Sequence, residues 1–324
     1  MRKLLLGLAA GALALSTLPA LAADPVTLQL KWVPQAQFAG YFVAKDKGFY
    51  AEENIDITIK PGSPDISPEQ VLAGGGADVA VAWMGGALAA RDQGAPLVNI
   101  AQPYKRSGLL MICPKDGPVQ TEADFPGKTL GVWFFGNEYP FMAWMNKLGL
   151  STEGGPDGVT VLKQNFDVSA LIDGQADCIS VMTYNELKQA ADAGFTADKL
   201  VIFNYSEMDN DLLEDGLYVM EPNLANAAFK DKMVRFVRAS MKGWQYAIEN
   251  PEEAAEIVLD NDESGAQILE NQIYMMSEVG KLIDVNDPAL DLTAYERTEK
   301  ALLDQKIITK EPTGAYTTEI TDAL

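Results

Sequence analysis

The sequence predicts an α/β protein made of two similar lobes that are joined by two crossover strands. Short apolar runs bounded by turn residues alternate with segments of helical periodicity, an order typical of parallel sheets with right-handed crossovers. The motif Gly75-Gly76-Ala77-Asp78 returns as Gly174-Gln175-Ala176-Asp177, and an apolar strand and a helix follow it both times. Two further apolar runs, residues 108–114 and 216–222, bracket the second half of this repeat and are placed to carry the chain into and out of the second lobe.

The first lobe is predicted to consist of strands with helices between them. Each strand is a run of alternating or continuous apolar residues, and each helix repeats apolar residues every three or four positions. The strands are predicted at residues 26–32, 55–60, 78–83 and 96–102, and the helices at residues 38–49, 68–75 and 85–94.

The second lobe is predicted to span residues 109–219, so that the first lobe comprises residues 24–108 and 220–324. Beyond Pro222 the pattern is helical, and Pro251 stands at the first position of a helix, where a missing N–H costs least. The strands of the second lobe are predicted at residues 129–134, 159–164, 178–182 and 200–204, and the C-terminal helices at residues 229–250, 251–260, 266–283 and 292–305.

The N-terminus has the pattern of a secretory signal peptide, which we assign to residues 1–23. Arg2 and Lys3 precede an apolar run, and the small residues of Ala20-Leu21-Ala22 form a cleavage site. The apolar run is too short to span a membrane comfortably and ends at Pro19, so we do not expect a membrane anchor. The segment predicts export, with the mature chain in the periplasm.

Composition excludes several classes of function. The net charge of −21 argues against partners such as nucleic acid and anionic membranes. The chain has no histidine, which excludes a Ser-His-Asp triad, a Cys-His pair and imidazole-based metal sites. No spacing of carboxylates indicates an acid–base pair, so we expect no catalytic residues, no metal and no cofactor. We interpret Cys113 and Cys178 as two small buried apolar side chains, although an exported compartment permits a disulfide.

Candidate ligand-binding residues follow from the position of the strand ends. Ligands of open α/β sheets bind outside the carboxyl ends of the strands, and two hinged lobes place those ends at a common cleft. The residues that we expect at the cleft are Trp32, Gln37, Phe38, Trp83, Met84, Tyr104, Phe135, Asn137, Glu138, Tyr184, Asn185, Glu186 and Asp215.

The segment 133–138, with the sequence WFFGNE, is the richest of these strand ends. Strand alternation makes Trp133 and one phenylalanine core residues, and we expect Phe135 rather than Phe134 to face the cleft. Aromatic faces can stack on a flat ligand ring, while Asn137 and Glu138 offer donors and acceptors to its polar edge. The Tyr184–Glu186 segment has the same order of side chains, although a glutamate there is also typical of a helix N-terminus.

These residues lie in segments that resemble a known family. The stretches LQLKWVPQAQFAGYFVAKDKGFYAEENIDITI, GADVAVAW and DFPGKTLGVWFFGNEYPF are similar to bacterial solute-binding proteins grouped with the thiamine pyrimidine synthases, and the resemblance covers residues 26–250. It implies a type II periplasmic binding protein, with a Venus-flytrap fold, that delivers its ligand to the permease and ATPase subunits of an ABC importer. We expect a monomer.

The resemblance also restricts the ligand. Family members bind thiamine pyrimidine precursors or riboflavin, and more distant ones bind nitrate or alkanesulfonates. Phe38 stands where pyrimidine-type members have a histidine, and the cysteine-rich motif of the fungal synthases is absent, so we do not expect a pyrimidine synthase. The leading interpretation is a pyrimidine precursor such as hydroxymethylpyrimidine or formylaminopyrimidine. Riboflavin is the alternative, favoured by Phe38 and the many aromatics. Anions rank lower, because Lys105-Arg106 is the only basic pair at a predicted cleft loop.

Overall fold

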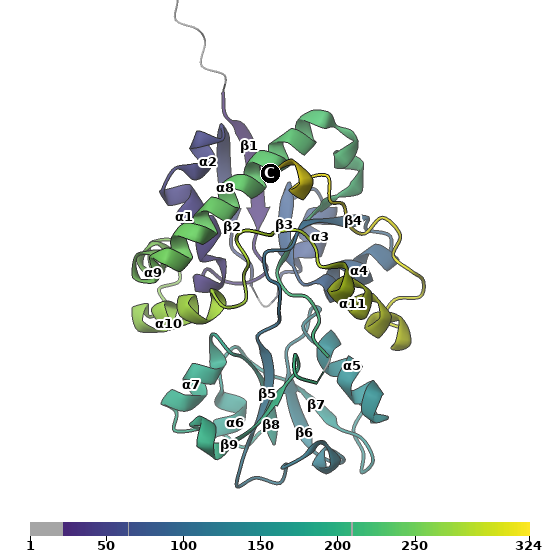
Figure 1. Cartoon of the computed structure of the whole chain (residues 1–324). Helices are drawn as coiled ribbons and strands as arrows, with labels where there is room; N and C mark the ends of the chain where they lie inside the picture. The colour runs from purple at the N-terminus through teal and green to yellow at the C-terminus, as the bar shows by residue number, and fades with distance from the viewer. Residues whose placement is uncertain (1–21, 64, 209) are drawn as a thin grey trace, which may run out of the picture.

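The computed structural model describes residues 22–63, 65–208 and 210–324, and nearly all of the predicted signal peptide lies outside these residues. Two α/β lobes lie one above the other, each built on a five-stranded sheet (Figure 1). The first sheet has the order β2 (Ile55–Lys60), β1 (Asp24–Gln29), β3 (Val79–Ala82), β10 (Gly216–Met220) and β4 (Leu97–Ala101). The second has the order β7 (Thr160–Lys163), β6 (Thr129–Val132), β8 (Cys178–Met182), β5 (Leu109–Pro114) and β9 (Leu200–Asn204).

Both sheets are mixed, which corrects the prediction of parallel sheets. In the first sheet β10 runs antiparallel to β3 and β4, and in the second β5 runs antiparallel to β8 and β9. The other strands run toward the space between the lobes, whereas a crossover strand enters its new lobe from that space and therefore runs the opposite way. Because β10 belongs to the first sheet, the chain is already back in the first lobe at Gly216. The lobe boundary predicted between residues 219 and 220 therefore falls inside this strand.

The internal repeat is visible as one hydrogen-bond pattern in both lobes. The Asp78 carboxylate accepts from the backbone N–H of Thr27 on β1 at 2.8 Å, and Asp177 accepts from Thr129 on β6 at 2.8 Å. The N–H of each aspartate donates back to the same threonine's carbonyl, at 2.9 and 2.8 Å. The Gly-x-Ala-Asp motif therefore recurs because its aspartate fixes a helix-to-strand turn to the neighbouring strand.

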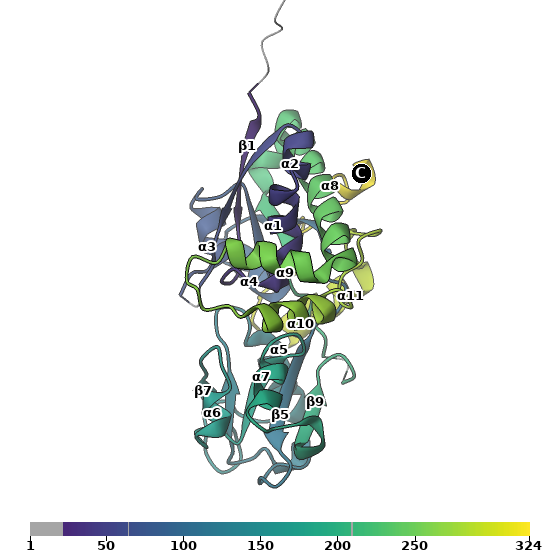
Figure 2. The same ribbon diagram turned by 90° about the vertical axis from the view of Figure 1, so that its left-hand side faces the viewer.

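Helices cover both faces of the first sheet (Figures 1 and 2). Gly40 and Gly243 allow α1 and α8 to approach so closely that a side chain on Gly243 would collide with the Gly40 carbonyl. The predicted helix at residues 38–49 is divided, because Gly48 adopts a left-handed conformation (φ 76°). One group of helices comprises η1 (Ala36–Phe38), α1 (Ala39–Asp46), α2 (Phe49–Glu52), α8 (Ala227–Glu249), α9 (Pro251–Asp260) and α10 (Leu269–Val279), and the other comprises α3 (Pro68–Ala73), α4 (Met84–Asp92) and α11 (Leu292–Asp304).

The second lobe carries α5 (Tyr139–Leu148), α6 (Ser169–Ile172) and α7 (Glu186–Asp192). A disulfide joins Cys113 of β5 to Cys178 of β8, so the interpretation of two separate apolar side chains was wrong. The antiparallel register that pairs Ile112 with Ile179 also places the two cysteines opposite each other, with 4.3 Å between their Cα atoms. Among the described residues, no helix has the length and apolar character required to cross a membrane.

Two crossover segments, residues 102–108 and 205–215, connect the lobes, and the side chain of Glu214 ties them together. Its carboxyl group accepts hydrogen bonds from the Ser107 hydroxyl and from the Gly108 backbone N–H, the latter at 2.7 Å. Its backbone carbonyl accepts from the Gln102 amide. Complete burial, together with the nearby Asp215, raises the pKa of Glu214 well above its usual range. The shift favours a neutral carboxyl group between the two crossover segments, which we call the hinge.

Candidate functional site

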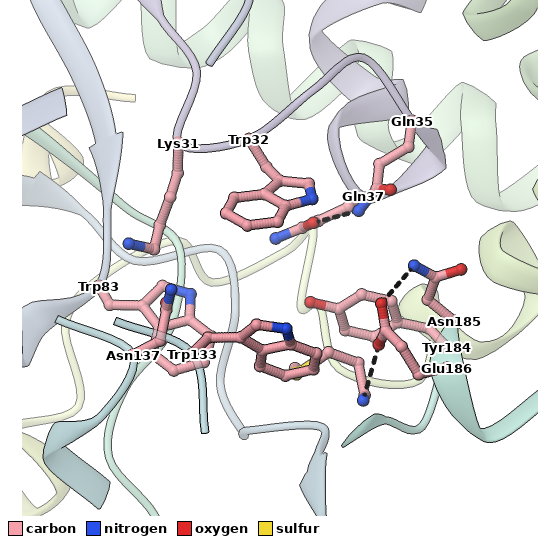
Figure 3. Close-up of a pocket in the computed structure, with 11 residues that line it drawn as sticks. Lys31, Trp32, Gln35, Gln37, Trp83, Trp133, Asn137, Tyr184, Asn185 and Glu186 are labelled. Atoms are coloured by element: carbon pink, nitrogen blue, oxygen red, sulfur yellow. Dashed lines mark hydrogen bonds between the residues drawn. The ribbon is translucent and has the colours of Figure 1, made fainter. Parts of the chain in front are cut away.

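A pocket lies between the lobes where the carboxyl ends of both sheets meet (Figure 3). Its cavity volume is about 40 Å³, below the roughly 300–1,000 Å³ of typical small-molecule sites, so a ligand requires the lobes to move apart from this arrangement. Each residue that lines the pocket either follows the carboxyl end of a strand or is the last residue of that strand. This is the position expected for a ligand site in an open α/β sheet. The lining residues are Lys31, Trp32, Gln35, Gln37 and Trp83 from the first lobe, and Trp133, Asn137, Met182, Tyr184, Asn185 and Glu186 from the second.

Four aromatic rings form the walls of the pocket. Trp32 lies on one side, and Trp133 and Tyr184 face it from the other lobe (Figure 3), with Trp83 beside them. The rings are held in place: the Trp133 indole N–H donates to the Asn165 carbonyl at 2.9 Å, and the Trp32 ring contacts Phe166 edge-to-face at 4.4 Å between centroids. A flat ligand can therefore stack between rigid aromatic surfaces contributed by both lobes.

Glu186 places a carboxyl group at one end of the pocket. Its Oε2 accepts from the Met182 backbone N–H at 3.0 Å, and its Oε1 accepts from the Asn185 amide at 2.7 Å. Burial raises the pKa of Glu186 to about 7, and these hydrogen bonds oppose the shift only in part. Near neutral pH the carboxyl group is therefore divided between protonated and ionised forms, and it can donate to a ring nitrogen or accept from an amine.

A chain of side-chain hydrogen bonds supports the first-lobe side of the pocket. Gln35 Nε2 donates to Gln37 Oε1 at 2.6 Å, and Gln37 Nε2 donates to Asp215 Oδ2 at 2.6 Å. The Tyr104 hydroxyl donates to the Gln37 carbonyl at 2.8 Å. Burial raises the pKa of Asp215 to about 6, against the lowering effects of Gln37 and of the Lys31 ammonium. Asp215 and Tyr104 thus orient the lining glutamines from behind the wall of the pocket.

Lys31 brings a cation into the pocket at a position that the sequence did not indicate. Its Nζ donates to the Phe135 carbonyl at 3.2 Å and lies 5.6 Å from the centroid of the Trp83 ring. Sequence reasoning placed Lys31 inside a strand, but β1 ends at Gln29, so this residue already belongs to the loop at the strand end. Lys31 continues the polar positions Thr27 and Gln29 of the alternating segment 26–32, so the sequence contains no signal that separates it from a solvent-facing strand residue. Lys105 does not reach the pocket, because its Nζ donates to the Ala289 carbonyl.

Seven of the thirteen predicted residues line the pocket and six do not. Those that line it are Trp32, Gln37, Trp83, Asn137, Tyr184, Asn185 and Glu186. Those that do not are Phe38, Met84, Tyr104, Phe135, Glu138 and Asp215. Sequence reasoning also omitted Lys31, Gln35, Trp133 and Met182 from the predicted residues.

The WFFGNE segment is arranged differently from the prediction. Trp133, expected in the core, is only 7% exposed but lines the pocket, whereas Phe135 is 45% exposed and Phe134 is 37% exposed. Because β6 ends at Val132, strand alternation stops before the aromatic residues, and Phe135 takes a left-handed conformation (φ 62°). Both phenylalanines line a second, separate groove, which Glu138 and residues of α3 and α4 from the first lobe also line.

The remaining differences have simple causes. Phe38 is fully buried at the end of η1, so the missing histidine does not translate into space in the pocket. Met84 is the first residue of α4 and packs into the core with Leu88 and Leu213.

Among residues 22–63, 65–208 and 210–324, no group of three or more Cys, Asp or Glu side chains is arranged to hold a metal ion.

Comparison with known proteins identifies the family. Residues 35–254 match the model of a family described as NMT1/THI5 like. The chain belongs to this family. One relative, a formylaminopyrimidine-binding protein from Halalkalibacterium halodurans, is 26% identical over 75% of this chain and 72% of its own length. Another, the riboflavin-binding protein RibY from Chloroflexus aurantiacus, is 29% identical over 72% of this chain but only 65% of its own length.

Solved structures share the fold of this NMT1/THI5-like chain. A protein from Bordetella bronchiseptica superposes with a TM-score of 0.69 at 18% identity, over 93% of this chain and 97% of its own. The periplasmic aliphatic sulphonate-binding protein SsuA of Escherichia coli superposes with a TM-score of 0.63 at 12% identity, over 89% of each chain. The protein therefore has the type II periplasmic binding protein fold. A desulfurization enzyme shares it with a TM-score of 0.55 at 13% identity, over 93% of this chain and 98% of its own, so the fold alone does not separate binding from catalysis.

Proposed function

We propose that this protein is the periplasmic substrate-binding component of an ABC importer and captures a thiamine pyrimidine precursor between its lobes. The fold, the family and the relative named for formylaminopyrimidine binding support the proposal. We also propose that it acts as an exported monomer without enzymatic activity. The lobe boundaries, which we place in the crossover segments 102–108 and 205–215, are part of the same proposal.

The observation that carries the proposal is the position of Glu186 beside the aromatic walls. An aminopyrimidine has an acceptor ring nitrogen next to an exocyclic amine that donates. A carboxyl group with a pKa near 7 matches this edge, because it can share one proton with the ring nitrogen while its other oxygen accepts from the amine. Trp32 and Trp133 would stack on the two faces of the ring, with Asn185 and Gln35 completing the polar contacts.

Calorimetry with formylaminopyrimidine and hydroxymethylpyrimidine tests the proposal. We expect tight, saturable binding of at least one of them, and a large loss of affinity in Glu186→Ala. Native mass spectrometry of protein purified from its own host would identify a ligand carried through purification. If neither pyrimidine binds the wild-type protein, the proposed ligand class is wrong.

Riboflavin is a second candidate, because four aromatic side chains line one pocket and a relative is named for riboflavin binding. Three fused rings need more stacking area than one, and the lobes would have to open further to admit them. Flavin fluorescence should fall sharply on stacking against Trp32 or Trp133, whereas a pyrimidine can change only the emission of the protein. Binding of nitrate or taurine alone would contradict both heterocycle proposals and would direct attention to Lys31.

A further inference from the structure

Lys31 is a buried cation within the candidate ligand pocket. Its side chain is 5% exposed, and its Nζ lies near Asn137 and Trp83, on the opposite side of the close-up from Glu186 (Figure 3). The pocket therefore has two chemically different ends, with a carboxyl group at one and an ammonium group at the other. Stacking residues lie between them.

The hydrogen-bonding capacity of Lys31 is not filled by the protein. An ammonium group has three N–H donors, and within the described part of the chain only the Phe135 carbonyl accepts one, at 3.2 Å. No carboxylate among these residues comes within ion-pair distance of Nζ. The ammonium lowers the pKa of two carboxyl groups, Asp215 and Glu138, but neither of them forms an ion pair with it. Burying a cation with unsatisfied donors is unfavourable unless another group supplies acceptors.

The position of the ammonium restricts what can supply those acceptors. Lys31 belongs to the first lobe and Phe135 to the second, so a ligand atom beside Nζ would contact both lobes at once. Asn137 lines the same side of the pocket, and one N–H of its amide donates to the Phe134 carbonyl at 2.8 Å. An oxygen atom at this place completes the hydrogen bonds of the lysine, whereas a second cation is repelled by it.

We propose that Lys31 determines specificity, by selecting ligands that carry a carbonyl or acidic oxygen at the end of the molecule remote from Glu186. The inference rests on the proposed function and narrows its ligand class. An aminopyrimidine whose side-chain amine is formylated presents a neutral carbonyl oxygen to Lys31. The same compound without the formyl group presents an ammonium group, which Lys31 would reject. The protein would thereby distinguish a formylated pyrimidine from its free amine.

The test measures, by calorimetry, the affinity of each of two ligands for the wild-type protein and three variants. The ligands are formylaminopyrimidine and its deformylated amine, and the proteins are wild type, Lys31→Met, Lys31→Arg and the matched control Lys45→Met. Lys45 lies on the exposed C-terminal turn of α1, outside the pocket. We expect Lys31→Met to weaken binding of the formylated ligand roughly 10- to 100-fold, the usual size for one hydrogen bond to a charged group. Its effect on the amine should be neutral or favourable.

The readout is the ratio of the two affinities, which separates a role in recognition from a role in folding. We expect the preference for the formylated ligand to shrink at least tenfold in Lys31→Met and to be retained in Lys31→Arg and Lys45→Met. Equal losses for both ligands in Lys31→Met would overturn the inference while leaving the proposed function intact. Absence of binding of either pyrimidine to wild type would instead overturn the proposed function. Should Lys31→Met fail to fold, the ratio for wild type and Lys31→Arg still decides, since a wild type that prefers the amine contradicts the inference.

Discussion

Glu186 is the residue whose surroundings most directly control the chemistry of the pocket. It is completely buried at the start of α7, with one backbone N–H and one amide donating to its carboxyl oxygens. The desolvation exceeds the effect of these two hydrogen bonds, so the pKa rises to about 7. A glutamate that the sequence identifies as favourable in the first turn of a helix thus also lines the pocket with a carboxyl group that can share a proton.

Binding of a pyrimidine should weaken as the pH rises above about 7. The complex holds one proton between Glu186 and the ring nitrogen, and the free protein loses that proton above the pKa of Glu186. By linkage, the dissociation constant should rise up to tenfold for each pH unit above that value and change little below it. Glu186→Gln should show a flat profile in calorimetry between pH 6 and about 9. An unchanged slope in that variant would assign the titration to another group, with Asp215 the first to examine.

The two aromatic sites of the WFFGNE segment should differ in their contribution to binding. Trp133 lines the pocket, whereas Phe135 lines the second groove, which it shares with Phe134 and Glu138. Trp133→Ala should weaken ligand binding by about 2 kcal/mol or more, as buried aromatic anchors do. Phe135→Ala, the matched control from the same segment, should bind within a few-fold of wild type in the same calorimetric titration. The opposite order would restore the arrangement expected from strand alternation.

At the scale of elements, the pairing of β5 with β8 makes a crosslink possible that neither strand reveals alone. The disulfide spans 65 residues of sequence and joins the crossover strand to the centre of the second sheet. Closing a loop of this length restricts the unfolded chain considerably, which stabilises the native state in the chain-entropy description.

Reduction of the disulfide should destabilise the protein by roughly 3–5 kcal/mol, as the chain-entropy relation gives for long loops. Urea unfolding with and without a thiol reductant measures this difference. Cys113→Ala/Cys178→Ala is the control, because a reductant has no other cysteine to act on in this sequence. Equal stability of wild type under both conditions, with oxidation verified by mass spectrometry, would contradict the expectation.

At the scale of the whole molecule, the two lobes meet around the pocket. A Cβ added to Gly136 of the second lobe would lie 3.1 Å from the Gly86 Cα of the first. The Tyr274 hydroxyl on α10 donates to the Thr183 carbonyl across the lobes at 3.0 Å. These contacts, with the bond from Lys31 to Phe135, define a closed arrangement, and ligand binding should shift the population toward it.

Gly136→Ala should oppose this closure. The new methyl group would press on Gly86, and overpacking of this kind costs about 1–3 kcal/mol, which should appear as weaker ligand binding. Solution scattering should also show a smaller decrease in radius of gyration on adding ligand. Gly155→Ala is the matched control: its φ of 93° is close to the 91° of Gly136, but nothing lies within 4 Å of its added Cβ. Equal effects of the two substitutions would mean that backbone strain, and not the lobe contact, is responsible.

The buried hinge carboxyl group should make overall stability depend on pH. The pKa of Glu214 is raised in the folded protein, so the folded state retains a proton that the unfolded chain releases above about pH 4.5. The stability that this proton provides is therefore complete at low pH and is lost as pH rises, by up to about 1.4 kcal/mol per unit. Glu214→Gln should reduce the decrease measured by urea unfolding between about pH 5 and 8. A pH dependence identical to that of wild type would remove Glu214 as its cause.

Local signals in the sequence were enough to define most elements. The strands β8 and β9 and the helix α9 have the predicted bounds, because their ends coincide with strong turn signals or with Pro251 at a helix start. The repeated Gly-x-Ala-Asp motif predicted two related lobes, since the aspartate acts within a single turn and its neighbouring strand. Seven of the pocket residues were predicted by the rule that ligands gather at the carboxyl ends of strands.

The tertiary structure decided what depends on contacts between distant segments. Lys31 and Trp133 line the pocket because β1 and β6 end earlier than their predicted strands, at Gln29 and Val132. The disulfide depends on a register between strands that the sequence separates by 65 residues. The sequence by itself determined most of the elements, the two lobes and the edge of each sheet at which the pocket lies, since these follow from local propensity and periodicity. Strand pairing within each sheet and packing between the lobes determined which side chains line the pocket, because the point where a strand leaves its sheet depends on its neighbours.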